Sequence, residues 1–263
     1  MNFVFDLDGT ICFNGQPISE KLLNALERLV DQEGHKVIFA SARSIRDLLP
    51  VLHERFHKYP MIGGNGSMVA NHGNIISTVN FQHDTLKEII QLIDTYHVSY
   101  LIDSDWNYSY TGSDTHPIFN SLDPQKRAKN VPLDQLQSFI KILMLTSSNM
   151  KEVEEKLKKM EIVVHTHRGE GVLDISPKGI DKWSGLQQLG IKEGEYIAFG
   201  NDINDISMFQ HALHSVMIGE NLQLSPFASE NVILSEDVEN IIVEKLEELG
   251  TMYRTNIDNR STV

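Results

Sequence analysis

The residues with the clearest capacity for chemistry are two aspartates near the start of the chain, Asp6 and Asp8, within a run of Asp-Leu-Asp-Gly-Thr. The apolar residues at 2–7 predict a buried strand that ends at Gly9. Side chains two residues apart on a strand share a face, so both carboxylates are placed to point into one crevice. A divalent cation that prefers oxygen ligands, such as Mg²⁺, relieves their mutual repulsion. Taken alone, the pair is equally consistent with two acids in an ordinary turn.

The segments around these acids predict an α/β fold with a doubly wound, mainly parallel sheet. A helix over about 19–34, a buried strand at 36–40 and a helix over 45–52 follow the first strand. The same alternation returns near the end of the chain, where residues 196–199 form a strand and 236–249 a helix. In open parallel sheets, ligands bind in the crevice beyond the carboxyl ends of the strands. The first strand places Asp6 and Asp8 at such an end.

The middle of the chain breaks this alternation and predicts a second domain. Residues 81–177 contain a helix, an aromatic-rich segment, a highly charged helix and short strands, and a hinge-like Pro-Lys-Gly run follows. A chain of 263 residues is long enough for about two domains. We therefore expect residues 1–80 and 178–263 to form a core, and residues 81–177 to form an inserted α+β domain.

The composition excludes several classes of partner. Lys and Arg number 23 against 36 Asp and Glu, a formal charge of −13, which argues against a nucleic-acid or anionic-membrane surface. The single cysteine, Cys12, excludes an intramolecular disulfide and a cysteine-rich zinc site. The apolar residues at 1–5 run directly into Asp6 and Asp8, so we expect no signal peptide, and no apolar run is long enough to span a bilayer. These features predict a cytoplasmic protein, either a monomer or a homodimer.

Four short motifs in order carry a resemblance to a known family. The Asp-Leu-Asp-Gly-Thr run at 6–10 resembles the first motif of the haloacid dehalogenase-like (HAD) phosphotransferases, and Ser41-Ala42-Arg43 resembles the second. Lys182 at the start of a predicted helix resembles the third, and the Gly-Asn-Asp-Ile-Asn-Asp run at 200–205 resembles the fourth. With a turn at 64–66 and the inserted domain, the chain is similar to the Cof-type HAD hydrolases with a type IIB cap.

The resemblance implies a Rossmann-like HAD core, a cap that determines substrate specificity, and a role for each motif residue. Asp6 would be the nucleophile that carries an aspartyl-phosphate, Asp8 the general acid and base, and Lys182 the cation that stabilises the charged transition state. Phosphate-binding residues would be Thr10, Ser41, Ala42, Arg43 and Asn204. Ligands of the Mg²⁺ cofactor would come from Asp6, Asp8, Asn201, Asp202 and Asp205.

Two of these residues have alternatives. Thr10 either helps to position the phosphate or Asp8, or is a buried threonine of the turn. Arg43 either reaches the substrate phosphate or the cap, or forms an ion pair with a nearby acid.

The fourth motif departs from the family pattern, because Asn201 stands where the first acid of the motif is expected. One hypothesis is that Asn201 binds the metal through its carbonyl oxygen while Asp205 supplies charge behind it. A second is that Asp202 replaces the missing carboxylate. A third is that catalysis is degraded.

These observations lead to one main function and several alternatives. We expect a Mg²⁺-dependent phosphomonoester hydrolase that acts on a small phosphorylated metabolite, either a sugar phosphate or a phosphorylated cofactor. A sugar phosphomutase on the same scaffold is the first alternative. A non-catalytic module that accepts phosphate on Asp6 and a protein that kept the fold for partner binding are less favoured, because an acid/base residue, a lysine and a large cap argue for catalysis.

Overall fold

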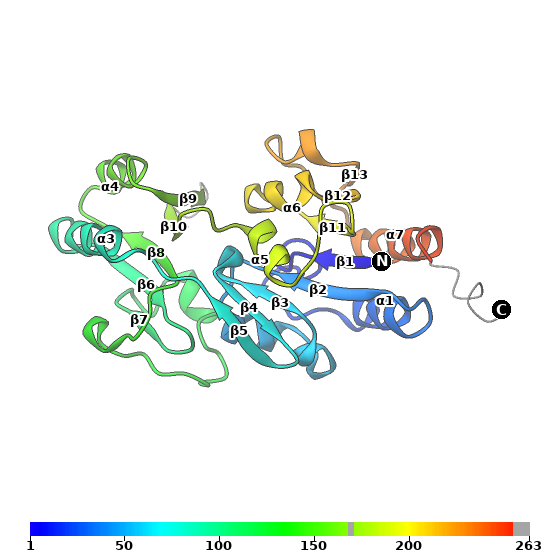
Figure 1. Ribbon diagram of the computed structural model, residues 1–263, viewed down its shortest axis with the longest axis horizontal. Helices are drawn as coiled ribbons and strands as arrows, with labels where there is room; N and C mark the ends of the chain where they lie inside the picture. The colour runs from blue at the N-terminus through cyan, green and yellow to red at the C-terminus, as the bar shows by residue number, and fades with distance from the viewer. Residues whose placement is uncertain (168–170, 255–263) are drawn as a thin grey trace. The chain divides into compact units, whose positions relative to one another are not determined.

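The computed structural model describes residues 1–167 and 171–254 of the chain. Contacts divide it into two compact units, which are taken separately: unit 1 comprises residues 1–39 and 191–263, and unit 2 comprises residues 40–190. The predicted domain boundaries at 80/81 and 177/178 are a different division, and they stay a prediction. Figure 1 labels the helices and strands of both units.

Unit 1 is built on parallel strands in the order β13-β12-β11-β1-β2. Their bounds are β1 (Asn2–Phe5), β2 (Lys36–Ala40), β11 (Tyr196–Gly200), β12 (His214–Ile218) and β13 (Glu230–Val232). Parallel strands covered by helices are apolar along their length, and β1 follows this rule, since Phe3, Val4 and Phe5 are fully buried. The predicted α/β class and parallel sheet are confirmed.

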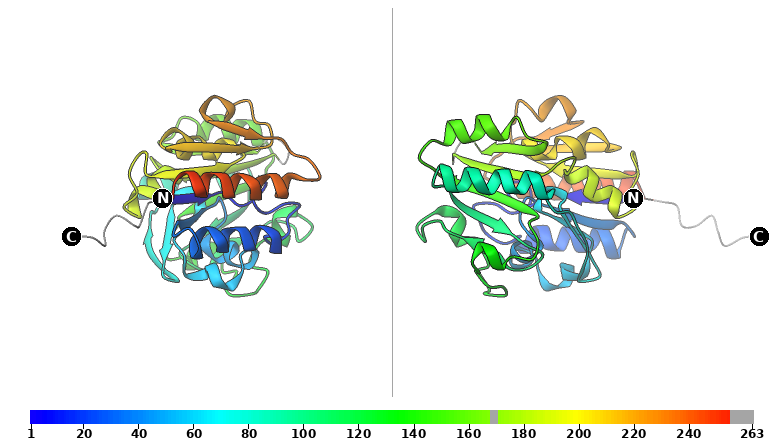
Figure 2. Two further views of the ribbon diagram at one scale, coloured as in Figure 1. Left: turned by 90° about the vertical axis from the view of Figure 1, so that its right-hand side faces the viewer. Right: turned by 60° about the vertical axis from the view of Figure 1, so that its left-hand side comes forward.

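Two long helices of unit 1 pack against each other beside β1. Helix α1 (Glu20–Asp31) contacts helix α7 (Val238–Met252), as the left view of Figure 2 shows. Ser19 caps α1, because its Oγ accepts a hydrogen bond from the N–H of Leu22. The short helices η6 (Ile203–Asp205), α6 (Ile206–Gln210) and η7 (Ser225–Phe227) complete the unit.

The first part of unit 2 is an antiparallel meander of β3 (Met61–Gly63), β4 (Met68–Asn71) and β5 (Asn74–Thr78). Short helical pieces surround it: α2 (Ile45–Leu48), η1 (Leu49–Val51), η2 (Glu54–Lys58), η3 (Gly64–Gly66) and α5 (Lys182–Gln188). The expected single helix over 45–52 is wrong. It changes to a 3₁₀ turn at Leu49 because Pro50 has no N–H for the α-helical ladder.

The second part of unit 2 is an antiparallel sheet in the order β7-β6-β8-β10-β9. Its strands are β6 (Ser99–Asp103), β7 (Tyr108–Tyr110), β8 (Lys141–Thr146), β9 (Ile162–His167) and β10 (Val172–Pro177). Helices α3 (His83–Thr95) and α4 (Met150–Leu157) cover one face, as the right view of Figure 2 shows. The short helices η4 (Pro117–Asn120) and η5 (Leu133–Gln135) lie in its loops.

The two faces of this sheet differ in chemistry, because side chains alternate along each strand. The face beneath α3 and α4 is apolar and includes Ile102, Ile142 and Ile175. The opposite face begins with a smaller apolar cluster that includes Leu101 and Leu145. Farther along the same strands it carries buried charged residues: Asp103, Lys141 and Asp174.

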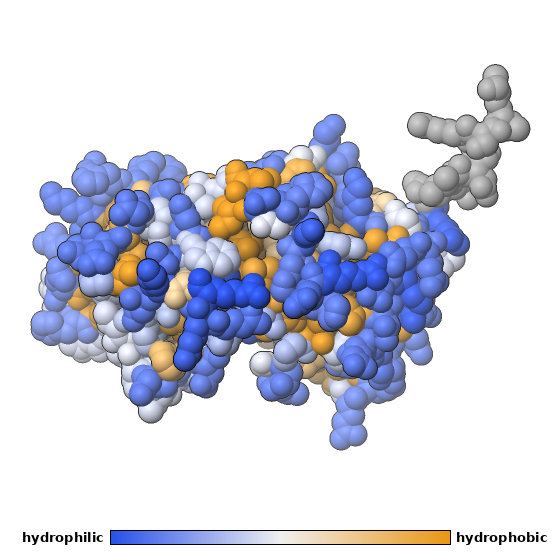
Figure 3. Space-filling model, turned by 90° about the horizontal axis from the view of Figure 1, so that it is seen from below, coloured by the Kyte–Doolittle hydropathy of each residue, from blue (hydrophilic) through white to orange (hydrophobic). Residues whose placement is uncertain are grey.

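The surface is mainly hydrophilic on the face drawn in Figure 3. In the described part of the chain, no helix combines the length and the apolar character that crossing a membrane requires.

Candidate active site

The loop after β1 holds Asp6 in a defined position. The Asp6 side chain is 4% exposed, and its backbone N–H donates to the carbonyl of Phe199 on β11. Thr10 Oγ1 lies 2.8 Å from Asp6 Oδ2, so the threonine hydroxyl orients the carboxylate. The loop itself is tight: the N–H groups of Thr10 and Cys12 both donate to the carbonyl of Leu7. Asp8, at the tip of the turn, is exposed.

The loop after β11 reaches the same point of unit 1. Asn201 Oδ1 lies 3.3 Å from Thr10 Oγ1, so Asp6, Thr10 and Asn201 form one polar cluster. The Asn201 side chain also lies against Gly9, whose φ is +79°, and a Cβ at Gly9 would come within 2.1 Å of the amide nitrogen. The turn therefore needs a glycine for two reasons, its left-handed backbone and the close approach of Asn201.

Asp205 holds this second loop from behind. It is fully buried, and its Oδ2 accepts hydrogen bonds from the N–H groups of Asn201 (2.9 Å) and Asp202 (3.0 Å). A Cβ at Gly200 would meet the Asp205 carboxylate at 2.6 Å, so the carboxylate closes directly over the end of β11. The bonds made by Asp205 fix the loop that presents Asn201.

Asp202 is turned toward a different partner. Its Oδ1 accepts from the N–H of Ile203 at 2.8 Å and from the side-chain amide of Asn221 at 3.1 Å. It is therefore the N-cap of η6. Asn204 lies half-buried on the same short helix. Of the two candidates for the altered position of the fourth motif, only Asn201 contacts the Asp6 cluster in the interactions described above.

The oxygen atoms around Asp6 have the chemistry of a magnesium site. Across residues 1–167 and 171–254, no group of three or more His, Cys, Asp or Glu side chains is arranged to hold a metal ion. An amide oxygen is also a suitable ligand for Mg²⁺, which keeps several waters and needs few protein groups. The Asp6 carboxylate and the Asn201 amide oxygen both lie within hydrogen-bonding distance of the Thr10 hydroxyl. Asp8, two residues after Asp6 in the chain, adds a second carboxylate. This donor set fits Mg²⁺.

In unit 2, the segment after β2 is held by backbone hydrogen bonds. The Ser41 N–H donates to Ile62 O at 2.8 Å, and the Ser41 carbonyl accepts from the N–H of Asn65 at 3.1 Å. The N–H of Arg43 donates to Ser41 Oγ at 3.1 Å. Arg43 Nη1 lies 3.4 Å from the carbonyl of Asp47, so the guanidinium contacts a backbone oxygen of its own segment. Residues 41–43 therefore form a rigid turn.

Lys182 is brought to the neighbourhood of this turn by close packing. It is the first residue of α5, is fully buried, and follows Asp181, whose side chain caps the helix at the N–H of Ser184. Helix α5 packs on η3, and a Cβ at Gly66 would come within 2.0 Å of the Asp181 carbonyl. Since η3 is bonded to Ser41 and Arg43 through Asn65 and Gly64, the second and third motifs belong to one packed region.

A buried charge network adjoins this region. Arg46 is 1% exposed and donates to both oxygens of Asp47 and, at 2.9 Å, to Asp103 on β6. Its guanidinium also lies 4.7 Å from the ring centroid of Tyr108. Burial alone would lower the pKa of Arg46, but Asp103 and Asp47 outweigh it and hold that pKa above its ordinary value. Burial raises the pKa of Asp103, and Arg46 opposes the rise.

The structure also identifies residues that the sequence analysis did not propose. Lys141 Nζ lies 3.0 Å from Asp174 Oδ2 and donates to the carbonyl of Ala42. The side-chain amide of Asn65 donates to the same Asp174 oxygen at 3.0 Å. A sequence signal existed for Asp174, because a carboxylate in the middle of an apolar strand needs a partner. Its partners are more than 30 residues away and cannot be read from the sequence.

The predicted site residues thus fall into two groups. Unit 1 brings together Asp6, Thr10 and Asn201, with Asp205 behind them and Asp8 beside them. Unit 2 contains the remaining predicted residues of the second and third motifs: Ser41, Ala42, Arg43 and Lys182. Their catalytic and binding roles stay predictions.

Comparison with known proteins gives a family match over most of the chain. The model of a family described as haloacid dehalogenase-like hydrolase matches residues 3–242. The 5-amino-6-(5-phospho-D-ribitylamino)uracil phosphatase YbjI of Escherichia coli (strain K12) is 22% identical over 218 residues, which cover 79% of this chain and 80% of that protein. The HMP-PP phosphatase of Serratia proteamaculans (strain 568) is 24% identical over 237 residues, 83% of each chain.

Solved structures share the fold. The HAD subclass IIB sugar phosphatase BT4131 superposes with a TM-score of 0.78 at 19% identity, covering 95% of this chain and 98% of that one. TM0651 from Thermotoga maritima gives a TM-score of 0.75 at 23% identity, covering 94% and 96%. The family match and the shared fold agree with the resemblance that the four motifs predicted.

Proposed function

We propose that this chain, which belongs to the haloacid dehalogenase-like hydrolase family and is a phosphatase, hydrolyses small phosphorylated metabolites with Mg²⁺ through an aspartyl-phosphate on Asp6. The observation that carries the proposal is the position of Asp6. It is buried at the carboxyl end of β1, and Thr10 holds one of its oxygens while Asn201 lies across the same hydroxyl. The hydrogen bond from Thr10 gives the carboxylate a fixed orientation, which favours attack on phosphorus in one direction.

The reaction divides into two displacements. In the first, an Asp6 oxygen attacks phosphorus, the bond from phosphorus to the leaving oxygen breaks, and Asp8 gives its proton to that oxygen. In the second, a water attacks the aspartyl-phosphate, Asp8 takes the water proton, and the bond from phosphorus to Asp6 breaks to release inorganic phosphate. The exposed position of Asp8 suits a group that exchanges a proton with a leaving alcohol and then with water.

Charge stabilisation comes from several groups in this proposal. Asp6, Asp8 and Asn201 would hold Mg²⁺, which when bound neutralises negative charge on the phosphoryl oxygens. Asp205 would fix the loop of Asn201, and Asp202 would remain the cap of η6. By the motif resemblance, Lys182 would supply a fixed positive charge, and the hydroxyl of Ser41 with neighbouring N–H groups would bind a phosphate oxygen. Thr10 orients Asp6, and Arg43 and Asn204 would assist phosphate binding.

The names of the relatives support a proposal for the substrate class, in which the inserted segment 81–177 acts as a cap. Curated relatives are named as phosphatases of 5-amino-6-(5-phospho-D-ribitylamino)uracil and of HMP-PP, and BT4131 is described as a sugar phosphatase. We propose that the substrate of this chain is likewise a small phosphate ester with a polar leaving group, either a sugar phosphate or a phosphorylated cofactor or cofactor precursor.

A turnover assay tests the reaction. The purified chain with Mg²⁺ should release free phosphate from p-nitrophenyl phosphate over many turnovers, and Asp6→Asn should lower the rate by more than about a thousandfold, since the nucleophile is lost. Full activity of the folded Asp6→Asn variant would exclude the aspartyl-phosphate. A single turnover that stops after one phosphate per chain would instead indicate a phosphate-accepting module.

Two further measurements define the substrate. A panel of sugar phosphates and phosphorylated cofactors ranks the substrates by kcat/KM. Product analysis with the best sugar phosphate separates a hydrolase, which yields free phosphate, from a mutase, which yields an isomer of the sugar phosphate.

A further inference from the structure

Lys141 is a buried lysine of the inserted segment and belongs to none of the four motifs. It begins β8, is 4% exposed, and lies on the sheet face opposite α3 and α4. Its ammonium has two partners in unit 2, the Asp174 carboxylate at 3.0 Å and the backbone carbonyl of Ala42. Ala42 is the middle residue of the predicted phosphate-binding turn.

The carbonyl that Lys141 contacts belongs to a peptide group with a second function. Ala42 C=O and Arg43 N–H are the two ends of one peptide unit, and the Arg43 N–H donates to Ser41 Oγ at 3.1 Å. The hydrogen bonds therefore run in series from Lys141 to Ala42 C=O, and from Arg43 N–H to the hydroxyl of Ser41. In such a series each hydrogen bond polarises the next. The Lys141 ammonium at one end therefore makes the Ser41 hydroxyl at the other end a stronger donor.

The accepted bond also restricts the direction of the serine hydroxyl. A hydroxyl has one proton and two lone pairs, and here one lone pair is used by the Arg43 N–H. The proton of Ser41 is thereby kept off the side of the Arg43 N–H and is left to donate to another acceptor, such as a phosphate oxygen.

We propose that Lys141 is a positioning residue for phosphate binding, which acts through the Ala42–Arg43 peptide to orient and polarise the hydroxyl of Ser41. The proposal rests on the proposed function, because it takes Ser41 as a phosphate ligand. It makes the phosphate-binding turn dependent on a residue of the inserted segment, 99 positions farther along the chain.

The surroundings of Lys141 hold its ammonium in place. Asp174 is 1% exposed and also accepts from the side-chain amide of Asn65, whose own N–H donates to the Ser41 carbonyl at 3.1 Å. The backbone of Asn65 is left-handed, with φ at +57°. Replacing a buried ion pair by apolar residues of similar volume is often neutral or favourable for stability. Stability alone therefore does not explain the Lys141–Asp174 pair well. A role in orienting Ser41 would explain both residues.

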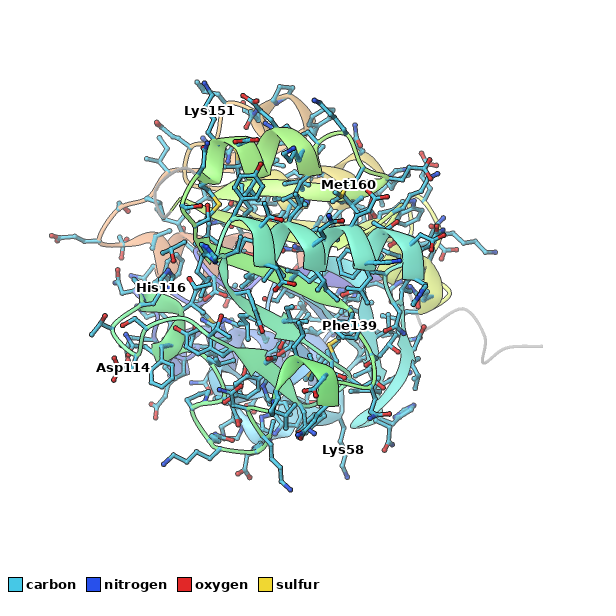
Figure 4. All side chains as sticks on the ribbon, turned by 90° about the vertical axis from the view of Figure 1, so that its left-hand side faces the viewer. Lys58, Asp114, His116, Phe139, Lys151 and Met160 are labelled. Atoms are coloured by element: carbon cyan, nitrogen blue, oxygen red, sulfur yellow. The ribbon has the colours of Figure 1, made fainter. Side chains whose placement is uncertain are left out.

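The test compares Lys141→Met with a matched control, Lys151→Met, on the exposed side of α4 (Figure 4). Removing one charge-assisted hydrogen bond should lower kcat/KM for p-nitrophenyl phosphate by roughly 10- to 100-fold and weaken the binding of inorganic phosphate by a similar factor. The control should match the wild type in both. The double variant Lys141→Met/Asp174→Asn, which removes the Asp174 charge together with its cation, should fold and show the same loss.

Three results would overturn the proposal. The first is unchanged phosphate binding in a folded variant that lacks Lys141. The second is a loss that differs between p-nitrophenyl phosphate and a sugar phosphate, because a residue that acts through Ser41 is indifferent to the leaving group. The third comes from Ser41→Ala: in the Lys141→Met background it should cause little further loss, and multiplicative losses would mean that the two residues act independently.

Phosphate binding, measured by calorimetry, separates this proposal from the proposed function. If the wild type binds phosphate but does not hydrolyse phosphate esters, the proposed function fails. The phosphate affinity of Lys141→Met, compared with that of the wild type, then still decides the role of Lys141. If the wild type binds no phosphate, both proposals fail.

Discussion

In unit 1, Asp205 and Asp202 accept hydrogen bonds from the backbone N–H groups of their own loop. In unit 2, Asp47 and Asp103 share the guanidinium of Arg46, and Asp47 also accepts from the Ser44 hydroxyl and the Asp123 N–H. Both arrangements satisfy buried or half-buried carboxylates, but the donors differ in charge. A backbone N–H brings only a partial positive charge and fixes the loop that carries it. The guanidinium brings a full positive charge, which offsets one of its two carboxylate partners and joins separate segments of the chain.

The difference separates two uses of acidic residues within one acidic chain. Carboxylates that accept from backbone N–H groups fix the loop that donates to them. Carboxylates held by a buried cation position the backbone around them, and removing the cation leaves a buried charge without compensation. The following predictions test this distinction, first in unit 2 and then in unit 1.

The largest effect is expected at Arg46. Replacing it by Met leaves Asp47 and Asp103 without their shared cation and should lower the free energy of unfolding by about 3–5 kcal/mol, as for other broken buried pairs. Urea unfolding measures it. The matched variant Arg46→Met/Asp103→Asn should recover part of the loss, and an Arg46→Met variant as stable as the wild type would show that the network is not structural.

A smaller effect is expected at Asp205. Asp205→Asn keeps an acceptor for the N–H groups of Asn201 and Asp202 but removes its charge, which should lower stability by about 1–2 kcal/mol. Because the loop of Asn201 loosens, kcat should fall more than the stability change alone implies. Thermal unfolding measures the stability and steady-state kinetics measure kcat on the same preparation. A variant with the kcat and Mg²⁺ dependence of the wild type would show that Asp205 does not fix the loop of Asn201.

The altered fourth motif gives a third comparison, between Asn201→Asp and Asp202→Asn. Asn201→Asp adds a carboxylate beside Thr10 and should tighten Mg²⁺ activation by roughly tenfold, since a charged oxygen binds the ion more strongly than an amide. Asp202→Asn changes only the cap of η6 and should leave the Mg²⁺ dependence unchanged. Titration of activity with Mg²⁺ measures both, and the reverse pattern would make Asp202 the ligand.

The smallest effect is a pH dependence at Glu230, at the edge of unit 1. Burial alone would raise the pKa of Glu230, but hydrogen bonds from Lys245 and His214 outweigh it and lower that pKa. The stabilisation is therefore complete above the ordinary value of 4.5 and is lost as the pH falls through the lower folded value. Glu230→Gln should cost less than about 1 kcal/mol at neutral pH, and the difference from wild type should vanish in acid. The free energy of unfolding of both proteins should be measured across this pH range. A difference between them that stays constant with pH would contradict the lowered pKa of Glu230.

The part of the site that the sequence predicted is the part built from local motifs. Asp6, Thr10 and Asp205 were proposed from short runs at strand ends, and each makes contacts within its own loop or the adjoining one. Which of Asn201 and Asp202 would bind the metal stays a prediction. The contact between Asp202 and Asn221, nearly 20 residues farther along the chain, could not be read from the sequence. Lys141 and Asp174 were missed because their partners are brought together only by the tertiary fold.

The fold shows the same limit. Long apolar strands such as β1 and β2 were predicted because burial on both faces makes them continuously apolar. The meander β3–β5 was not predicted, since its strands are short and β3 leads directly into the glycines of η3. The turn at His72 and Gly73, both with positive φ, is the local hairpin signal that was overlooked.

The division of the chain has a consequence for its synthesis. Unit 2 is one continuous stretch, residues 40–190, so Lys141 and the turn at Ser41 can meet while the ribosome is still adding residues. Unit 1 is discontinuous, and β1 must wait for β11 before Asp6 acquires Asn201 as a neighbour. Until then β1 has β2 but not β11 as a strand neighbour, and the predicted phosphate-binding turn can form before the predicted nucleophile Asp6 meets Asn201.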